Sequence, residues 1–229
     1  MALDTYTKLL LHTDGTDEST TFVDSSPSGH TCTAMDSATI STDQSKFGNA
    51  SGFFPDWAAI KVADSDDWDF GTGSFTVDFW VRFLVDQPAT FFWRYINFER
   101  YVVIDYISGT TLRFLDYPVG YAHEVTAPWA PSVDTWYHVA LVRNGTGAGC
   151  FKFYVDGTYV TSTYGRGTES LAVTDYTDLY IGYRYILNIN QLNGYLDEYR
   201  ISKGIARWTS NFTPPTRAYG TNTPQIQIF

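Results

Sequence analysis

The chain has 229 residues and carries 15 basic against 25 acidic side chains, so its formal net charge is −10. An acidic surface repels phosphate backbones and anionic membranes, which excludes nucleic acid as an expected partner. No apolar run approaches the roughly 20 residues that cross a bilayer, so no membrane insertion is expected. All-β domains of this length commonly form one unit, and no linker rich in Pro, Ser and Gly divides the chain.

The aromatic and acidic residues are unusual in number and in type. The chain holds 17 Tyr, 16 Phe and 7 Trp, and such residues suit pleated sheet surfaces. Aromatic rings both fill cores and stack on sugars, and composition leaves these two roles open. Among the acids Asp outnumbers Glu, and Asp is typical of turns and of calcium loops. Composition therefore favours a loop-rich β protein with Ca²⁺ sites.

Period-2 alternation marks strands along the first half of the chain, whereas the 3.6-residue period of helices is nearly absent. Further strands are predicted at residues 5–12, 30–34, 59–62, 90–98, 101–107 and 110–116. One face of residues 75–83 is uniformly apolar and is predicted to be core: Phe75, Val77, Phe79, Val81 and Phe83. Trp80 falls on the other face, where it is either covered by a neighbouring loop or part of a ligand platform.

The second half adds strands at residues 136–143, 150–156, 178–183 and 192–202. Asp156 and Gly157 between two apolar runs predict a two-residue hairpin, because a type I′ turn needs positive φ at both central positions. The only helix expected is a short turn near residues 205–208. So many strands suit two packed sheets, and we predict an all-β fold, a single two-sheet antiparallel β-sandwich, over residues 1–219. Residues 220–229 form a tail that adds to a sheet edge or docks on another subunit.

Three ordered blocks in the final part of the chain carry a family resemblance: residues 134–143 (DTWYHVALVR), 151–157 (FKFYVDG) and 194–207 (GYLDEYRISKGIAR). Upstream blocks at residues 9–15, 22–30, 45–48 and 66–82 extend it. Together they resemble the laminin-G-like branch of the concanavalin A-like lectin/glucanase superfamily. The resemblance implies a concanavalin A-like jelly roll, a scaffold that carries lectins, enzymes and protein-binding modules alike. Residues 91–129 and 165–192 match nothing in it, so specificity is expected there.

The motifs of hydrolytic catalysis are missing from the sequence. Hydrolysis on this scaffold needs paired carboxylates on one strand, typically as Glu-x-Asp-x-x-Glu, and no glutamate lies in such a pattern. Asp197 and Glu198 are adjacent, so on a strand they point to opposite faces. No Gly-x-Ser-x-Gly or His-Glu-x-x-His motif appears either. We therefore expect no enzymatic activity, and a glycoside hydrolase is the least favoured alternative.

Three aspartates are candidate calcium ligands. A hard cation prefers several oxygens at short range, and Asp14, Asp24 with the turn at residues 25–29, and Asp197 supply them. The resemblance implies that the first and last strands pair and that a structural Ca²⁺ lies near the terminal strands. Alternatively, Asp24 begins an Asx turn and Asp197 pairs with a neighbouring Arg or Lys.

Aromatic rings and polar side chains crowd into the two unmatched segments, Tyr101 and Tyr117 among them. Sugars offer apolar C–H faces to rings and hydroxyls to polar groups, so this mixture is typical of a carbohydrate site. The alternative is that half or more of the rings are core. The residues that we predict to contact a ligand are Trp93, Arg94, Tyr95, Tyr121, His123, Trp129 and Tyr185.

The two cysteines, Cys32 and Cys150, fall in predicted strands. A disulfide needs a specific Cα separation that sequence does not reveal, so we expect two buried thiols, with a bridge as the alternative. Neither cysteine suits a metal site.

The sequence as a whole favours a non-catalytic carbohydrate-binding module that contacts a glycan or polysaccharide. Such domains occur in secreted microbial proteins and in bacteriophage virion proteins, and the chain enters its first predicted strand soon after Met1 without a signal peptide. We therefore expect a place on a bacteriophage virion or an extracellular location, with homo-oligomers or other virion proteins as partners. The main alternative is a structural virion decoration or subunit-contact protein that binds no sugar.

Overall fold

The computed structural model describes residues 3–107, 109–117, 123–146, 149–160, 178–184, 187 and 189–220, together with the backbone of residues 163–164. These residues form sixteen strands and one 3₁₀ turn, η1 (Asp66–Trp68). The strands in chain order are β1 (Thr7–Leu11), β2 (Cys32–Met35), β3 (Thr39–Ser41), β4 (Ser51–Phe54), β5 (Ala59–Val62), β6 (Phe75–Phe83), β7 (Ala89–Asn97), β8 (Arg100–Ile107), β9 (Thr111–Tyr117), β10 (His123–Pro128), β11 (Trp136–Arg143), β12 (Phe151–Val155), β13 (Thr158–Val160), β14 (Thr163–Tyr164), β15 (Leu179–Gly182) and β16 (Gly194–Lys203).

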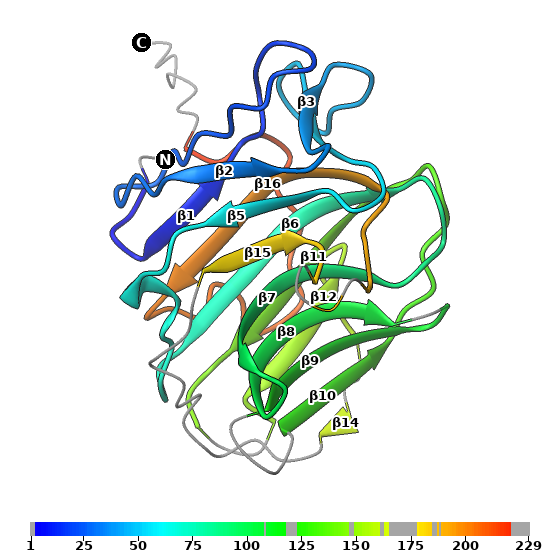
Figure 1. Ribbon diagram of the computed structural model, residues 1–229. Helices are drawn as coiled ribbons and strands as arrows, with labels where there is room; N and C mark the ends of the chain where they lie inside the picture. The colour runs from blue at the N-terminus through cyan, green and yellow to red at the C-terminus, as the bar shows by residue number, and fades with distance from the viewer. Residues whose placement is uncertain are drawn as a thin grey trace, which may run out of the picture.

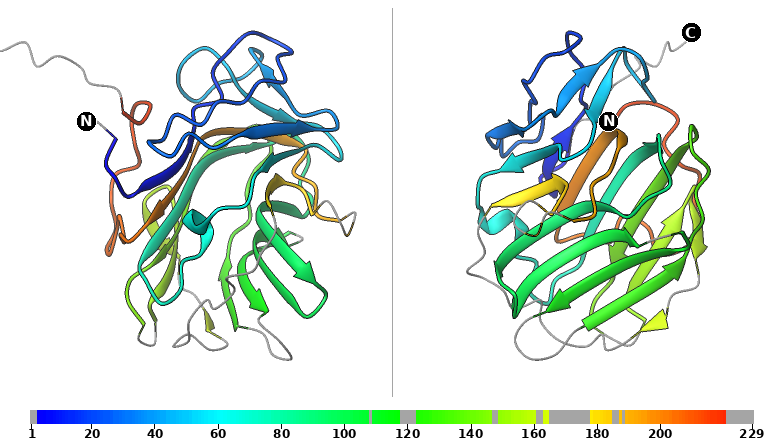
Figure 2. Two further views of the ribbon diagram at one scale, coloured as in Figure 1. Left: turned by 60° about the vertical axis from the view of Figure 1, so that its left-hand side comes forward. Right: turned by 45° about the vertical axis from the view of Figure 1, so that its right-hand side comes forward.

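The strands form two sheets of eight strands, which Figures 1 and 2 show packed against each other as two layers. The first sheet has the order β13-β12-β11-β6-β16-β4-β3. Its eighth strand, β1, pairs with the C-terminal part of β16, past the residues that pair with β4. The second sheet has the order β14-β10-β9-β8-β7-β15-β5-β2. All the pairings are antiparallel, and the first strand pairs with the last, as predicted. The fold is the predicted all-β sandwich.

The main core lies between the sheets and is rich in aromatic rings. All five apolar residues predicted to share one face of β6 are buried in it. The ring of Phe79 shows how the layers interlock, because it stacks on Tyr199 of β16 with centroids 5.6 Å apart and contacts Phe91 of the second sheet at 4.6 Å. Aromatic pairs at these separations add to the free energy of area burial. The core therefore joins both sheets into one packed unit.

The structure confirms one predicted turn and contradicts another. Asp156 and Gly157 have φ of 48° and 73° and join β12 to β13, so the predicted type I′ hairpin is confirmed. The prediction of a helical turn near residues 205–208 is wrong. There Thr76 of β6 donates to the carbonyl of Ile205 and accepts from the main-chain N–H of Arg207, at 3.2 and 3.0 Å. A side chain of the sheet thus forms hydrogen bonds with main-chain groups that would pair with each other in a helix.

Cys32 and Cys150 are not joined by a disulfide. Cys150 is buried as predicted, whereas Cys32 is only half-buried on β2 at the edge of the second sheet. Burial raises the pKa of the Cys32 thiol to about 12, so it stays protonated at neutral pH.

The tail predicted at residues 220–229 lies, beyond Gly220, outside the described residues. Its docking and the domain boundary at residue 219 stay predictions. In the described part of the chain, no helix has the length and the apolar character that crossing a membrane requires.

Candidate functional site

The outer face of the first sheet is covered by the chain's own C-terminal segment, residues 204–220. Trp208 and Phe212 stack on each other with centroids 4.0 Å apart and pack on the apolar cluster of this face. Both rings contact the fully buried His138 edge-on, at 5.5 and 5.7 Å. Trp80 contacts the same histidine at 5.2 Å and is 5% exposed. Phe47 meets the Trp80 ring edge-on at 5.8 Å, and Lys46 Nζ lies 3.8 Å from the ring centroid. Of the two roles open to Trp80, cover by a neighbouring loop is therefore the one found.

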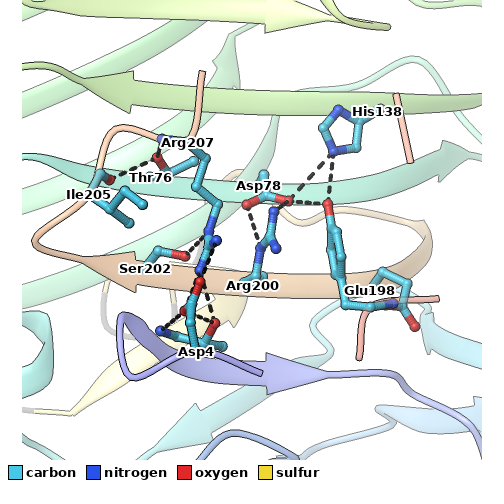
Figure 3. A network of polar contacts seen from close by, with 11 residues as sticks. Asp4, Thr76, Asp78, His138, Glu198, Arg200, Ser202, Ile205 and Arg207 are labelled. Carbon is cyan, nitrogen blue, oxygen red and sulfur yellow. Dashed lines mark hydrogen bonds and ion pairs between the residues drawn. The ribbon is translucent and has the colours of Figure 1, made fainter. Parts of the chain in front are cut away.

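A buried polar network fastens the same C-terminal segment (Figure 3). Asp78 of β6 is fully buried and accepts hydrogen bonds from Arg200 of β16 at 3.0 and 3.1 Å. Asp78 also accepts the hydroxyl of Tyr219, whose main-chain N–H donates to Glu198 at 2.7 Å. Burial opposes ionisation of Asp78, but Arg200 and His138 outweigh it and hold its pKa at about 2. These contacts close the part of this face around Asp78, and a cavity of about 480 Å³ lies next to it, lined by Asp4, Arg200, Arg207 and residues 213–220.

The outer face of the second sheet carries a ladder of rings from neighbouring strands, which we call the aromatic face. Ladder pairing places Trp93 beside Tyr180, and Tyr101 between Tyr95 and Tyr117. Ring centroids lie 5.4 Å apart for Trp93 and Tyr95, 5.2 Å for Trp93 and Tyr101, and 5.4 Å for Tyr101 and Tyr117. Trp93 is fully buried, whereas Tyr101 and Tyr117 are half-buried. The last two rings thus form the part of the ladder nearest to solvent.

A polar cluster lies on the same face, four residues from Tyr101 along β8 and four residues from Tyr117 along β9. We call it the Asp105 cluster, and it comprises Asp105, Arg113, Arg184 and Asn190. The fully buried Asp105 carboxylate accepts Nε and Nη2 of Arg113 at 3.0 and 2.8 Å. Its Oδ2 also accepts Nη2 of Arg184 and, at 3.3 Å, Nδ2 of Asn190. The Arg184 guanidinium lies 5.1 Å above the ring of Trp93, in cation–π contact.

Trp57 stands beside the aromatic face in the turn before β5. It is 47% exposed, and its ring meets Tyr183 edge-on at 5.5 Å between centroids. Because Tyr183 directly precedes Arg184, Trp57 and the Asp105 cluster contact the same loop. Trp57 has φ of 71°, and a bulky residue holds such a conformation at a cost of about 1–3 kcal/mol. Asn193 helps to hold this turn by donating Nδ2 to Asp56 at 3.0 Å.

These groups offer a ligand two kinds of contact on one face. Half-buried tyrosines and an exposed indole present rings to the C–H faces of a sugar. The guanidinium and amide groups around Asp105 donate hydrogen bonds to hydroxyl or carboxylate oxygens. Since Asp105 already holds these donors in place, a ligand does not have to order them.

Three of the predicted ligand residues lie on β7, where alternation separates them. Trp93 and Tyr95 share the aromatic face, with exposed fractions of 0% and 8%. Arg94 is buried on the opposite side of the strand and binds Asp69 and Asp64 at 2.7 and 2.6 Å. Trp93 and Tyr95 therefore pack beside the half-buried ring of Tyr101 on this face, and Arg94 binds the segment around η1.

Of the other four predicted ligand residues, the two that the structure describes do not lie on the aromatic face. Trp129 is 8% exposed and belongs to the main core cluster. His123 is 5% exposed and faces the buried Asp116, with 3.5 Å between Nδ1 and Oδ2. Both residues are therefore buried packing residues, as the alternative interpretation of these rings predicted. Tyr121 and Tyr185 lie outside the described residues.

Sequence reasoning did not single out Trp57, Asp105, Arg113 or Arg184. A signal existed for Asp105 and Arg113, because period-2 alternation puts them on the same faces as Tyr101 and Tyr117 of their own strands. Trp57 and Arg184 gave no such signal. Their positions depend on a loop whose contacts only the folded chain supplies.

Two of the three predicted calcium ligands lie at one loop, residues 44–49. Asp197 Oδ2 accepts the main-chain N–H groups of Lys46 and Phe47 at 2.8 and 3.0 Å, and Asp14 Oδ1 accepts that of Asn49 at 3.0 Å. Asp197 is 1% exposed, and its Oδ1 has no hydrogen-bond partner among the described residues. Burial raises the pKa of Asp197 to about 7, and the charge of Asp14 is among the contributions. An orphaned carboxylate oxygen with a second carboxylate nearby fits a divalent cation.

Asp24 does not belong to this group. Its Oδ1 accepts the N–H groups of Leu10 and Ser26 at 3.0 and 2.8 Å, and its Oδ2 accepts the Ser26 hydroxyl and the N–H of His30 at 2.9 and 2.7 Å. This is the Asx turn that was the alternative for Asp24. Within the described ranges no three His, Cys, Asp or Glu side chains are grouped to hold a metal ion. A cation at Asp14 and Asp197 therefore needs main-chain or water oxygens as further ligands.

Comparison with known families agrees with this architecture. Residues 56–207, more than half of the chain, match a laminin-G family described as the concanavalin A-like lectin/glucanases superfamily. The chain belongs to this superfamily. The predicted resemblance and the jelly-roll sandwich are thereby confirmed. No curated protein matches the sequence.

Solved structures with the same fold include two kinds of binding domain. The botulinum neurotoxin serotype C1 binding domain aligns with a TM-score of 0.61 and 15% identity over 87% of this chain and 49% of its own. The binding domain of botulinum neurotoxin DC in complex with SialylT aligns at 0.60 and 12%, over 87% and 48%. Domain 4 of AbnA, an extracellular arabinanase from Geobacillus stearothermophilus in complex with arabinotriose, aligns at 0.61 and 15%, over 87% and 93%. The chain thus spans about half of the toxin domains and nearly all of the arabinanase domain.

Proposed function

We propose that this superfamily member is a non-catalytic carbohydrate-binding module whose ligand lies on the aromatic face. The observation that carries the proposal is the half-buried Tyr101–Tyr117 stack, which shares one sheet face with the preorganised donors of the Asp105 cluster, four residues further along β8 and β9. Rings and fixed donors on one surface are what sugar recognition requires. The shared fold with an arabinanase domain and toxin binding domains supports a binding role at the level of the scaffold.

Absence of catalysis is part of this proposal. Asp197 and Glu198 are each 1% exposed, so neither carboxylate reaches a glycosidic bond from solvent. They also bind separate partners, because Glu198 contacts His12 at 2.6 Å whereas Asp197 binds the loop at residues 44–49. Paired carboxylates that flank one bond are the usual requirement for hydrolysis. Release of reducing ends from a laminarin- or agar-type polysaccharide would contradict the proposal.

A glycan array probed with the purified chain in buffer containing Ca²⁺ tests the function. We expect binding to a cluster of related glycans, and calorimetry on the strongest of them then locates the site. Tyr101→Ala should weaken binding about tenfold, since one stacked ring contributes about 1.4 kcal/mol. The matched control is Tyr6→Ala, because Tyr6 is 45% exposed and precedes β1 of the other sheet. A blank array, or equal loss in both variants, would contradict the proposal and favour the subunit-contact alternative.

We also propose a structural Ca²⁺ held by Asp14 and Asp197. The unpartnered Oδ1 of Asp197 and the adjacent loop at residues 44–49 support this choice, with loop carbonyls or water completing the shell. The role of the ion would be to neutralise two carboxylates next to Glu198 and to hold the loop against β16. This site is distinct from the aromatic face, so Ca²⁺ would act on stability.

Display on a bacteriophage virion or in the extracellular space completes the proposed role, with homo-oligomers or other virion proteins as partners. Its support is the membership of a superfamily whose domains occur in secreted and virion proteins. Mass spectrometry of purified virions, or of culture supernatant, from the source of the sequence tests the location. Light scattering tests the oligomer, and detection only in the cell lysate as a monomer would contradict this part of the proposal.

A further inference from the structure

Charge is unevenly shared within the Asp105 cluster. Two guanidinium groups, those of Arg113 and Arg184, bind one carboxylate, that of Asp105. Arg113 has a second acidic neighbour, Glu124, with 3.6 Å between Nη1 and Oε1. The Glu124 side chain is 43% exposed, so its charge is largely solvated. Arg184 has Asp105 as its only acidic partner among the described residues.

Arg184 is also poorly placed to be solvated. It is 6% exposed, lies over the Trp93 ring, and its Nε is buried without a hydrogen-bond partner among the described residues. A buried cation that shares its counterion is costly, because the low dielectric strengthens its repulsion from the second cation. The burial penalty and the charge of Arg113 both lower the pKa of Arg184, and Asp105 opposes them. Among the described residues, the two guanidinium charges thus face one buried carboxylate, with the partly exposed Glu124 as the other acidic neighbour.

We propose that the Asp105 cluster receives the carboxylate of an acidic sugar, such as a uronic or sialic acid. This inference rests on the proposed glycan-binding function and specifies its ligand. The arginines supply the donors and, among the described residues, more positive charge than the buried Asp105 balances. The Tyr101–Tyr117 stack, on the same face and four residues along β8 and β9, supplies a surface for a sugar ring. Arg113, with 18% of its side chain exposed, and the half-buried Asn190 form the solvent-facing part of the cluster.

The setting strengthens the specificity of such a contact. The chain carries a formal charge of −10, so a carboxylate meets repulsion over most of the surface. The Asp105 cluster instead presents two guanidiniums around one buried carboxylate, with Glu124 at its exposed side. Because a planar guanidinium suits a carboxylate better than a hydroxyl, the cluster discriminates between an acidic sugar and its neutral counterpart.

The test compares matched acidic and neutral probes on the full chain. We would measure binding of 3′-sialyllactose against lactose, and of tetragalacturonate against its methyl ester, by calorimetry at constant ionic strength. The expected result is at least one pair in which the acid binds about tenfold or more tightly than its neutral partner, as one added charge-assisted contact allows. If neutral probes bind equally well or better, the inference fails while the proposed function stands. If no glycan binds, both fail.

Two variants test the charge argument. In Arg113→Gln and in Arg184→Gln one arginine still pairs with Asp105, so the carboxylate stays compensated while the surplus charge disappears. Each variant should lose the preference for the acidic probe, so that the acidic and the neutral member of a pair bind with similar affinity. Arg82→Gln is the matched control, because Arg82 pairs with the exposed Asp134 on the other sheet. Loss of acidic preference in this control, or its retention in Arg113→Gln, would overturn the inference.

The two variants also keep the test independent of folding. Arg113 is partly exposed, so its substitution is the milder of the two, and thermal melting checks both. If Arg184→Gln does not fold, Arg113→Gln alone decides. An equal loss of acidic and neutral binding in a folded Arg113→Gln would show that the arginine only supports the face, which contradicts carboxylate recognition.

Discussion

Buried aspartates differ in charge state because each has different neighbours. Asp78 keeps a pKa of about 2 although it is fully buried, since Arg200 and His138 compensate its charge. The pKa of Asp116 rises to about 6, because burial outweighs the nearby His123 and Arg143. Burial raises the pKa of Asp197 to about 7, and the charges of Glu198 and Asp14 add to the rise. Aspartate side chains in this protein thus have three roles: a permanently charged ion, a titrating group and a candidate metal ligand.

The raised pKa of Asp116 predicts a specific pH dependence of stability. The folded state holds the proton up to about pH 6, whereas the unfolded chain releases it near its usual 3.8. The stabilising effect is therefore complete below pH 3.8 and is lost as the pH rises through 6. Asp116→Asn removes this pH dependence. The free energy of unfolding of the variant minus that of wild type should therefore be about 1 kcal/mol larger at pH 8 than at pH 5.

Urea unfolding at the two pH values measures this difference. Asp43→Asn is the control, because it makes the same chemical change at an exposed position. An effect of Asp116→Asn that is equal at pH 5 and pH 8 would mean that Asp116 does not titrate between them.

Calcium binding at Asp14 and Asp197 predicts opposite behaviour of two kinds of aspartate variant. For wild type, Ca²⁺ at about a hundredfold excess over its Kd should add about 2.7 kcal/mol and raise Tm by about 5 °C or more. Asp197→Asn should abolish this rise, which differential scanning fluorimetry with Ca²⁺ or EDTA measures. Asp24→Asn should keep the rise but start from a lower Tm, because four hydrogen bonds end on Asp24. A wild type indifferent to Ca²⁺ would refute the site.

At the scale of elements, the C-terminal segment acts as a cover for the first sheet. Trp208 and Phe212 pack on the apolar cluster there, and Tyr219 reaches Asp78. Sheet faces need such a cover when they carry apolar groups, because exposed apolar surface is costly in water. The second sheet has no equivalent segment within the described residues, apart from Leu187 against its apolar cluster. This asymmetry leaves the aromatic face as the candidate for recognition.

Trp208→Ala tests the covering role of the segment. Removing a ring that stacks on Phe212 at 4.0 Å and contacts His138 should lower the free energy of unfolding by about 2–3 kcal/mol. Thr209→Ala is the neighbouring control, because its side chain is exposed and only its main-chain carbonyl binds Lys152. Glycan binding should be unchanged in both variants, since the segment lies on the other sheet. A binding loss in a stable Trp208→Ala would move the site to this face.

At the scale of the whole molecule, the shared core predicts one cooperative transition. The main cluster takes residues from both sheets, and β16 pairs with β1, β4 and β6. Neither sheet keeps a core when the other unfolds. Calorimetric and van't Hoff enthalpies of unfolding should therefore agree within error at fixed Ca²⁺ concentration. Two resolved transitions would divide the predicted single domain of residues 1–219.

Strands and hairpins were predictable from the sequence because their signals are local. The alternation in β6 and the Asp156-Gly157 turn depend on neighbouring residues and on backbone sterics. The Asx turn at Asp24 was open as an alternative for the same reason. The helical turn near residues 205–208 was wrong because Thr76, more than a hundred residues away in the chain, binds that backbone.

The sequence by itself determined the family, the sheet-forming pattern and the shortage of catalytic motifs, since these are properties of contiguous residues. Only the tertiary structure decided which rings and charges face solvent. Trp93 and Trp129 are covered whereas Trp57 is exposed, and Asp105 gathers two arginines, one of them from a different part of the chain. Burial and charge compensation are sums over segments distant in sequence. They take their values only when the sheets and loops are packed together.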